Sequence, residues 1–405
     1  MVITTDPEIA AIIAAEEKRL QETLGMIPSE NYASTAVRKA LGSVLVNKYA
    51  EGYPKKRYYA GNENIDMIEE IAQQRAKKLF GAEHVNVQPH SGSPANLAVY
   101  TALCKPGDKI MGLALSHGGH LTHGHKVSIT GQLYTAVQYT VNPETYRLDY
   151  DAIRKKAREE RPKIIVAGAT AYPRIIDFKE MHEIATEVGA ISLADISHLA
   201  GLVATNVHPS PLPFTDIVTT TTHKTLRGPR GALIMCKKEF AEKIDKAVFP
   251  GLQGGPHNHT IAAIAIALKE AATANFKRYA QQIVKNAQAL AATLTQENIN
   301  LITKGTDNHL LLIDVTKNNL SGQQAETLLE QAGIIVNKNT IPFDTRPPKD
   351  PSGIRLGTPL LTTRGMKEQE MQQIGTWIAR LIKQKITPQE VQPQVKAWCA
   401  EFPLP

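Results

Sequence analysis

Residues 216–231 read DIVTTTTHKTLRGPRG, and this segment organises the rest of the chain. It begins with an aspartate and two β-branched residues, which predict a strand that runs into four threonines. Lys224 follows among hydroxyl groups, where a neutral amine could form a Schiff base with a carbonyl compound, and where His223 and Arg230 could favour the neutral form. The same pattern also fits a strand with a basic, solvated turn, so Lys224 needs support from the rest of the chain.

Strand patterns and helix patterns alternate on both sides of this segment. Short apolar runs predict strands at 84–87, 109–114, 163–167, 190–194 and 231–236. Helical periodicity or polar helix patterns fall at 64–80, 149–160, 177–188 and 257–297. This alternation predicts an α/β fold with a mostly parallel sheet and with ligands at the carboxyl ends of the strands.

The chain is long enough for more than one domain. An amphipathic helix is expected at 7–24, and a second, smaller set of α/β patterns begins near residue 308. We therefore expect an N-terminal helical arm, a large ligand-binding domain and a small C-terminal domain, at 1–26, 27–275 and 276–405.

Several polar loops follow the predicted strands. Ser91, Gly92 and Ser93 lie between a strand and a helix start, so they could form an anion-binding cup or simply cap the helix. Asp195 ends another strand, as a ligand or as a helix cap. Arg355 in a short strand offers a planar fork for a carboxylate, or is a surface residue of an edge strand.

Two loops have unusual composition. Four of the chain's 12 tyrosines lie within residues 49–59 around Glu51, which suggests a binding role, a subunit interface or both. Residues 117–125 contain four histidines, but no carboxylate or cysteine keeps zinc-site spacing, so we expect no metal and favour stacking of a histidine on a flat ligand.

Composition narrows the class of protein. The net charge of +7 could favour nucleic acids, yet the basic residues mix with acids as on solvated helix faces, so binding of nucleic acid is not expected. Three scattered cysteines suit a reducing cytoplasm. The N-terminal residues lack a signal-peptide pattern, and the apolar run 261–268 is too short to cross a bilayer, so we expect a cytoplasmic protein.

Together these segments resemble serine hydroxymethyltransferase, a fold-type I pyridoxal-phosphate enzyme. The resemblance covers about residues 28–381. The motifs that carry it are PSEN at 28–31, YAEGYP at 49–54, SGS at 91–93, HGGHL at 117–121, Asp195 with His198, residues 219–231, QGGP at 253–256, GTDNH at 305–309 and GIR at 353–355.

The resemblance implies a large domain with a mostly parallel seven-stranded sheet and a smaller C-terminal α/β domain. It also implies reversible transfer of the hydroxymethyl group of serine to tetrahydrofolate, giving glycine and 5,10-methylenetetrahydrofolate through aldimine and quinonoid intermediates. The cofactor would be pyridoxal 5'-phosphate, covalently bound to Lys224, with tetrahydrofolate as co-substrate. The enzyme would be a homodimer with shared active sites.

The resemblance also assigns roles by matching motifs. The catalytic residues would be Lys224, Glu51, His223, Tyr59 and Asp195. The cofactor would contact Ser91, Gly92, Ser93, His120, Thr170, Asp195, His198 and Lys224, with Tyr49 and Gly255 from the partner subunit. Serine and folate would meet Ser29, Glu51, Tyr59, Arg355, Leu115, Gly119, His120, Leu121 and Arg230, with Asn337 and Asn339 as further folate candidates.

Four positions depart from the family pattern without removing a catalytic group. They are Ala60, Thr170, Ala194 and Ser197, where a glycine, a serine, a valine and an alanine are expected. The nearest alternative activity is folate-independent cleavage of threonine or allo-threonine by an aldolase of the same fold. An RNA-binding protein is an alternative of a different class.

Overall fold

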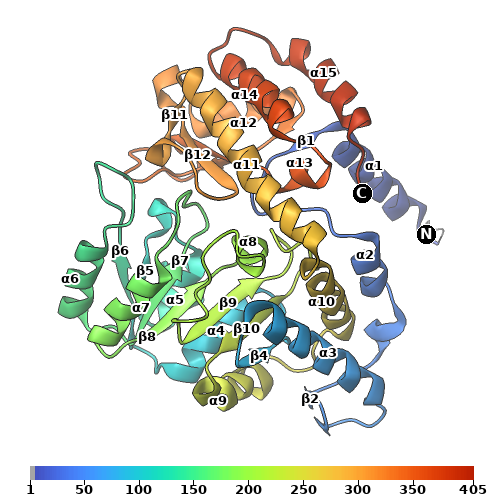
Figure 1. Ribbon diagram of the computed structural model, residues 1–405, viewed down its shortest axis with the longest axis vertical. Coiled ribbons are helices and arrows are strands. Elements are labelled where there is room, and N and C mark those ends of the chain that lie inside the picture. The colour runs from blue at the N-terminus through green and yellow to red at the C-terminus, as the bar shows by residue number, and fades with distance from the viewer. Residues whose placement is uncertain (1–4) are drawn as a thin grey trace. The chain divides into compact units, whose positions relative to one another are not determined.

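The computed structural model describes residues 5–405, and contacts within the chain divide it into two compact units (Figure 1). One unit is Ala33–Gln281, and the other combines the segment that ends at Tyr32 with Gln282–Pro405. The N-terminal segment therefore shares a unit with the C-terminal part of the chain. The predicted functional domains, 1–26, 27–275 and 276–405, stay a prediction.

The unit Ala33–Gln281 is built on a seven-stranded sheet. Its strands, in spatial order, are β4 (His84–Asn86), β10 (Ala232–Cys236), β9 (Ile217–Thr221), β8 (Ile191–Asp195), β7 (Ile164–Gly168), β5 (Lys109–Leu113) and β6 (Thr135–Tyr139). β10 runs antiparallel to both β4 and β9, and the other paired strands of this sheet are parallel to each other. The predicted α/β fold with a mostly parallel sheet is confirmed.

The central strands β7, β9 and β10 are buried along their whole length, as expected for strands with helices on both faces. On one face, α4 (Gly92–Leu103) and α9 (Ala241–Lys246) contribute Val99 and Ile244 to a core with Ile164, Leu193 and Ile234. The helix α7 (Phe178–Glu187) packs on β7 and β8. The other main helices of this unit are α2 (Thr35–Leu41), α3 (Glu63–Phe80), α6 (Tyr150–Glu160) and α10 (Asn258–Ala271).

The helix expected at 257–297 is wrong as a single element. The structure has α10, which ends at Ala271, and a separate helix α11 (Ala274–Gln296). The reason is local, because the hydroxyl of Thr273 accepts a hydrogen bond from the backbone N–H of Phe276 at 3.2 Å and so caps the new helix. The strand β6 and the short helix α5 (Ile129–Leu133) before it were not predicted from the sequence.

The second unit contains a four-stranded antiparallel sheet. Its order is β11 (Asn300–Leu301), β12 (Leu310–Asp314), β15 (Gly353–Gly357) and β14 (Asn337–Asn339). Within the same unit, β1 (Leu24–Gly25) pairs with β13 (Ile334–Ile335). The helices of this unit include α1 (Pro7–Glu22), α12 (Gly322–Gln331), α13 (Pro359–Thr363), α14 (Glu368–Ile382) and α15 (Pro388–Glu401).

Arg364 binds the N-terminal segment to the rest of this unit through hydrogen bonds. Its buried guanidinium donates to the carbonyls of Thr23 at 2.9 Å, Gln21 at 3.1 Å and Cys399 at 2.7 Å. A guanidinium can hold several carbonyls at once because its donors are spread over a rigid plane. The N-terminal segment is therefore structurally part of this unit.

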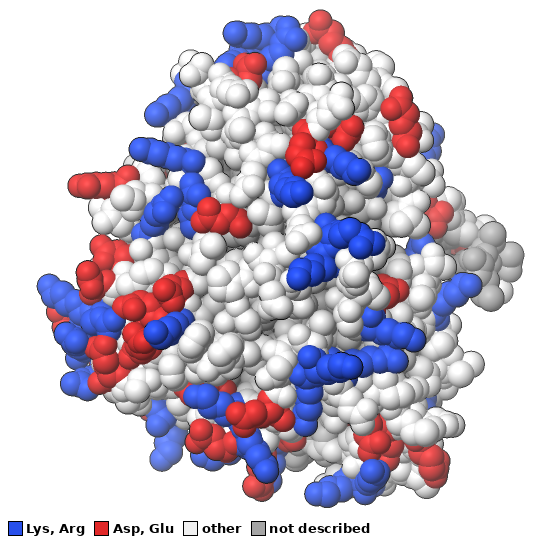
Figure 2. Space-filling model, viewed as in Figure 1, with Lys and Arg blue, Asp and Glu red and all other residues white. Residues whose placement is uncertain are grey.

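Charged side chains of both signs are interspersed over α6 and α7 on the face shown in Figure 2. Arg158 on α6 pairs with Glu187 on α7 at 2.9 Å, as expected for a solvated helix surface. Within residues 5–405, no helix combines the length and apolar character required to cross a membrane.

Candidate active site at the carboxyl end of the parallel sheet

Asp195 ends β8 and is buried, with only 8% of its surface exposed. One carboxylate oxygen, Oδ2, accepts a hydrogen bond from Asn96 Nδ2 at 2.9 Å and lies 3.1 Å from His123 Nε2. The other oxygen, Oδ1, accepts from the backbone N–H of Ser197 at 3.0 Å. Burial alone would raise the pKa of Asp195, but the contacts with His123, His120 and Ser197 outweigh it and hold the pKa well below its usual range. The side chain is therefore a carboxylate at neutral pH.

A polar network connects Asp195 to its surroundings. Asn96, on α4, donates to Thr122 Oγ1 at 2.9 Å and accepts from the hydroxyl of Thr219 at 2.6 Å. Thr122 Oγ1 in turn lies 2.8 Å from Nδ1 of His120. Hydrogen bonds from four separate parts of the chain thus fix the carboxylate of Asp195 and the imidazole of His120.

Burial lowers the pKa of His120 to about 4, and the neighbouring His123 adds to this shift. His120 is therefore neutral at pH 7. A neutral ring that is held by its Nδ1 is suited to stack on a flat ligand. Among the described residues, no three histidine, cysteine, aspartate or glutamate side chains gather as a metal site.

The Lys224 turn follows directly after β9. Thr222 holds this turn in place, because its carbonyl accepts from the N–H of Gly228 at 2.7 Å and its hydroxyl donates to the carbonyl of Pro229 at 2.7 Å. On the other side of the lysine, the hydroxyl of Thr225 donates to the carbonyl of His198 at 2.9 Å. The turn that carries the half-buried Lys224 is therefore held on both sides of this residue, and it lies next to the loop after β8.

His223 precedes this lysine. Burial, together with the positive charges of Lys224 and Arg230, lowers the pKa of His223 to about 3, so its ring is neutral. Its Nδ1 atom is buried and has no hydrogen-bond partner among residues 5–405. A buried polar atom without a partner is a candidate contact for a ligand. Arg230 itself is exposed.

The Ser91-Gly92-Ser93 segment forms the start of α4 at the same edge of the sheet. A methyl group on Gly92 would lie 2.8 Å from Cγ2 of Thr221 and 3.8 Å from Oγ of Ser197, so the glycine permits close packing there. Ser197 Oγ accepts from the N–H of Thr221 at 3.1 Å. The departure at Ser197 therefore adds a hydrogen bond between β9 and the end of β8.

The histidine loop and the end of β7 are also joined. Both Thr170 and Ala171 donate their backbone N–H groups to the carbonyl of Gly118, at 2.7 and 3.1 Å. A methyl group on Gly119 would lie 1.9 Å from the carbonyl oxygen of Leu113, which explains why the loop needs glycine at that position. Leu115 in the same loop is half-buried.

A second group of predicted residues lies in the tyrosine-rich loop. Tyr49 donates a long hydrogen bond of 3.4 Å to Glu51 Oε1, and the rings of Tyr49 and Tyr59 meet edge-to-face at 5.3 Å. The charge of Glu51 raises the pKa of Tyr59, so this phenol stays neutral. A methyl group on Gly254 would lie 3.1 Å from Glu51 Oε1, and one on Gly255 would lie 3.1 Å from Tyr49 Cζ. The glycine loop and the tyrosine loop therefore touch within one chain.

A third group belongs to the other unit. Arg355 on β15 is buried, and its Nε donates to Asn337 Oδ1 at 3.2 Å. Burial lowers the pKa of Arg355 to about 10, so it remains charged at neutral pH. The loop that contains Ser29 packs against the end of this strand, since a methyl group on Gly357 would lie 2.6 Å from Pro28 Cα. Asn339 lies on β14 beside Asn337.

A cavity of about 450 Å³ lies beside the start of α4. Ser93 and Leu121, predicted for the phosphate and the folate, both line it, and Leu121 is 43% exposed. Much of the remaining wall is apolar and includes Leu97, Val127 and Ile129.

Several residues that form hydrogen bonds around the candidate site were not predicted from the sequence. They are Asn96, His123, Thr122 and Thr219 around Asp195, and Arg57 and Gln88 behind Glu51. The run of histidines was noticed as a candidate site, but its spacing does not reveal which histidine reaches Asp195.

In this mostly parallel sheet, β8 ends in the buried carboxylate of Asp195, and Lys224 lies in the turn after the neighbouring strand β9. This arrangement is that of fold-type I pyridoxal-phosphate enzymes. The sequence model of the family described as "Serine hydroxymethyltransferase" matches residues 2–378. The chain belongs to this family.

Curated proteins of the same family are similar to this chain over nearly its full length. A serine hydroxymethyltransferase of Desulfotalea psychrophila is 57% identical over 403 residues, which is 99% of this chain and 95% of that protein. One from Sorangium cellulosum is also 57% identical, with 99% and 95% covered. A third, from Koribacter versatilis, is 56% identical over 98% of this chain and 94% of its own.

These comparisons confirm the predicted family, the fold class and the assignment as a pyridoxal-phosphate-dependent transferase of one-carbon metabolism. Enzymes of this family use serine, glycine and tetrahydrofolate, so the predicted cofactor and small-molecule partners are confirmed as well. The roles of single residues stay predictions.

Proposed function

We propose that this chain transfers the hydroxymethyl group of serine reversibly to tetrahydrofolate, with Lys224, Asp195, Arg355 and Glu51 as the principal residues. The observation that carries the proposal is the buried carboxylate of Asp195 at the end of β8, beside the fixed Lys224 turn. A carboxylate that stays ionised in this position suits a protonated ring nitrogen.

The residues at this edge of the sheet fit pyridoxal phosphate. Asp195 would accept from the ring nitrogen, the neutral His120 would stack on the ring, and Lys224 would bind the aldehyde group through its amine. The start of α4, at Ser91–Ser93, presents hydroxyl groups and backbone N–H groups for the phosphate. When bound, the cofactor supplies an electron-accepting ring that stabilises negative charge at the substrate Cα.

Further contacts to the cofactor are proposed from the same geometry. Thr170 lies in the loop just after β7 and His198 in the loop just after β8, and we assign both to the neighbourhood of the phenolic oxygen. The neutral ring of His223, whose buried Nδ1 is without a described partner, would help to select the substrate.

Arg355 would bind the carboxylate of serine or glycine. Its guanidinium is charged, buried and oriented by Asn337, so it can present parallel N–H donors to a carboxylate. Ser29 belongs to the same unit and would add a hydroxyl donor to this contact. Fixing the carboxylate selects which bond at Cα is cleaved.

Glu51 would move a proton at the hydroxymethyl oxygen of the substrate. It is half-buried beside the hydroxyl group of Tyr49, and the neutral phenol of Tyr59 can donate to the same region. Folate would approach Leu115, Gly119 and Leu121. Asn337 and Asn339 are further folate candidates, and Arg230 would support the tyrosines.

We also propose a cytoplasmic homodimer with shared sites. Tyr49, Tyr58 and Tyr59 are 54%, 74% and 48% exposed, although they sit beside the proposed proton donor. Exposed aromatic groups of this kind suit a subunit interface. Tyr49, Glu51, Tyr59 and Gly255 would then serve the partner's active site. The three free cysteines suit a reducing compartment.

The activity is tested by incubating the protein, loaded with pyridoxal phosphate, with serine and tetrahydrofolate. We expect formation of methylenetetrahydrofolate and glycine in equal amounts. Cleavage of serine or threonine at a rate that ignores folate would contradict the transfer reaction and favour an aldolase.

Shared sites are tested by mixing Lys224→Ala with Glu51→Gln before joint unfolding and refolding. Random pairing gives half mixed dimers, each with one intact site, so about a quarter of the wild-type activity should return if sites are shared. No recovery above the two parent variants would contradict sharing.

A further inference from the structure

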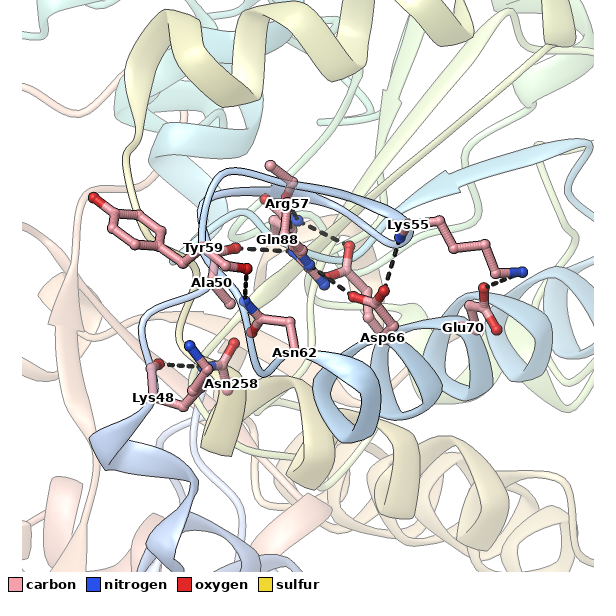
Figure 3. Close-up of polar contacts among 12 residues, drawn as sticks. Lys48, Ala50, Lys55, Arg57, Tyr59, Asn62, Asp66, Glu70, Gln88 and Asn258 are labelled. Carbon is pink, nitrogen blue, oxygen red and sulfur yellow. Dashed lines mark hydrogen bonds and ion pairs between the residues drawn. The ribbon is translucent and has the colours of Figure 1, made fainter.

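The tyrosine-rich loop is held through its main chain by a buried arginine. Arg57 lies on β3 (Lys56–Arg57), which pairs with β2 (Gly52–Tyr53) in a short hairpin. Its Nη1 donates to the carbonyl of Ala50 at 2.9 Å (Figure 3). The same nitrogen donates to the carbonyl of Gly52 at 2.7 Å, and Ala50 and Gly52 flank Glu51. One guanidinium nitrogen thus binds the carbonyls of the two residues that flank Glu51.

The rest of the guanidinium is anchored on α3. Arg57 Nε donates to Asp66 Oδ1 at 2.9 Å, and Nη2 donates to Glu69 Oε2 at 2.7 Å. The side chain of Arg57 is 4% exposed and that of Glu69 is 0% exposed. The five donors of an arginine lie in one rigid plane, so the orientation of α3 is transmitted directly to the loop.

Two amide side chains extend this frame. Gln88 Nε2 donates to the carbonyl of Gly52 at 2.9 Å and to Glu69 Oε1 at 2.8 Å. Asn62 Nδ2 donates to the carbonyl of Tyr59 at 2.8 Å (Figure 3). The carbonyls around Glu51 and of Tyr59 are therefore fixed by side chains of residues that the proposed function does not use.

The side chain of Glu51 is held differently. Its contact with the hydroxyl of Tyr49 is long, at 3.4 Å, whereas its own carbonyl accepts from the N–H of Tyr58 at 3.0 Å. Gly52 has a φ of +95°, and a methyl group there would lie 2.4 Å from the carbonyl oxygen of Lys56. The direction of the Glu51 side chain is thus set mainly by its backbone.

We propose that Arg57 is a positioning residue for the transfer reaction, which orients the carboxylate of Glu51 by binding the carbonyls of Ala50 and Gly52. Arg57 touches neither substrate nor cofactor in this account. The inference rests on the proposed role of Glu51. It predicts that loss of Arg57 acts on turnover through Glu51 and leaves the Asp195 side of the site unaffected.

The test is a double-mutant cycle with Arg57→Lys and Glu51→Gln in the full-length protein loaded with pyridoxal phosphate. A lysine keeps the positive charge but cannot bridge both carbonyls and both carboxylates. We expect Arg57→Lys alone to lower the folate-dependent kcat by about 10- to 100-fold, because small displacements of reacting groups are costly. The bound cofactor, measured by its absorbance, should stay at the wild-type level.

The decisive readout is the effect of Arg57→Lys in the Glu51→Gln background. If Arg57 acts through Glu51, adding Arg57→Lys to Glu51→Gln should change kcat less than about twofold, since coupled residues are not additive. An equal loss of kcat in both backgrounds would mean a general structural role and would overturn the inference. If Arg57→Lys does not fold, Asp66→Asn, which removes one acceptor of the guanidinium, replaces it in the same cycle.

Lys55→Met is the matched control. Lys55 is in the same hairpin, but its side chain is 79% exposed and pairs with Glu70 at 3.1 Å on the surface. We expect wild-type kcat in this variant, and a loss as large as that of Arg57→Lys would overturn the inference. An inactive wild-type protein would instead refute the proposed function, and full activity of Glu51→Gln would refute the role of Glu51.

Discussion

Asp195 and Glu51 are the two carboxylates of the proposed site, and the protein holds them in opposite ways. Asp195 is buried, and side-chain and backbone groups from three parts of the chain bind its oxygens directly. Glu51 is half-buried, has one long contact with Tyr49, and is held through the peptide groups beside it.

The difference matches two chemical tasks. A group that must keep its charge throughout the reaction benefits from fixed donors at the carboxylate itself, which lower its pKa. A group that must accept and return a proton needs a fixed position without donors that hold its charge constant. Binding the backbone rather than the carboxylate satisfies the second need.

Asp195→Asn should have the largest effect of the changes considered. The amide keeps the size of the side chain but cannot carry the negative charge that would keep the ring nitrogen of the cofactor protonated. We expect turnover to fall by about a thousandfold, comparable to losing a key electrostatic contact. Steady-state kinetics with serine and tetrahydrofolate, alongside circular dichroism to verify folding, measure the effect. A loss below tenfold would show that the charge is not needed.

Glu51→Gln should leave the cofactor absorbance intact and lower folate-dependent turnover by about a hundredfold, the usual scale for a general acid or base. Glu63→Gln, an exposed carboxylate at the start of α3, is the matched control and should behave as wild type. Wild-type turnover in Glu51→Gln would remove this residue from the mechanism.

Gly52→Ala tests whether the backbone really places Glu51. Alanine would have to adopt the positive φ of Gly52, and its methyl group would lie 2.4 Å from the carbonyl oxygen of Lys56. We therefore expect a stability loss of about 1–3 kcal/mol and a reduced kcat. Gly81→Ala is the control, because Gly81 has a φ of +75° but a methyl group there meets no atom within 4 Å. Chemical unfolding and kcat should respond far more strongly at Gly52, and equal responses would contradict the placement.

His120→Phe tests whether His120 is neutral in the folded protein, by its effect on how the free energy of unfolding depends on pH. The native pKa of His120 is about 4, whereas an unfolded histidine titrates near about 6.5. Between these values the unfolded state binds more protons, so the free energy of unfolding should rise with pH. Phenylalanine cannot titrate, and unfolding of the cofactor-free protein by urea should depend less on pH between about 4 and 6.5. An unchanged pH dependence would contradict the assignment.

Ser197→Ala should have the smallest effect. It removes the acceptor at 3.1 Å for the N–H of Thr221 but leaves the donors to Asp195 in place. We expect about 1 kcal/mol less stability, the usual value of one hydrogen bond, with nearly unchanged turnover. A large loss of turnover would show that this hydroxyl takes part in positioning Asp195.

The same comparison shows which parts of the site the sequence could predict. Asp195 was predicted because an acid at the end of a parallel strand lies where ligands bind. Its partner Asn96 is 99 residues away on α4, and only the strand order and the helix placement bring the two together. Long-range hydrogen bonds of this kind leave no periodic pattern in the sequence.

Arg57 was missed for a different reason. In the sequence it ends the run Lys55-Lys56-Arg57, which looks like an ordinary solvated cluster of charges. The hairpin turns Arg57 toward α3 and leaves Lys55 on the surface. The break between α10 and α11 could have been predicted, since Thr273 is a typical cap residue, but the continuous helical periodicity concealed it.

The most direct test of the whole account is the absorbance spectrum of the purified protein with pyridoxal phosphate, before and after glycine and tetrahydrofolate are added together. We expect a protein-bound band at the violet edge of the visible region, which Lys224→Ala lacks. We also expect a new band at longer wavelength that requires both ligands. A protein that stays colourless with pyridoxal phosphate would contradict the account, and a bound band that ignores folate would contradict the transfer reaction.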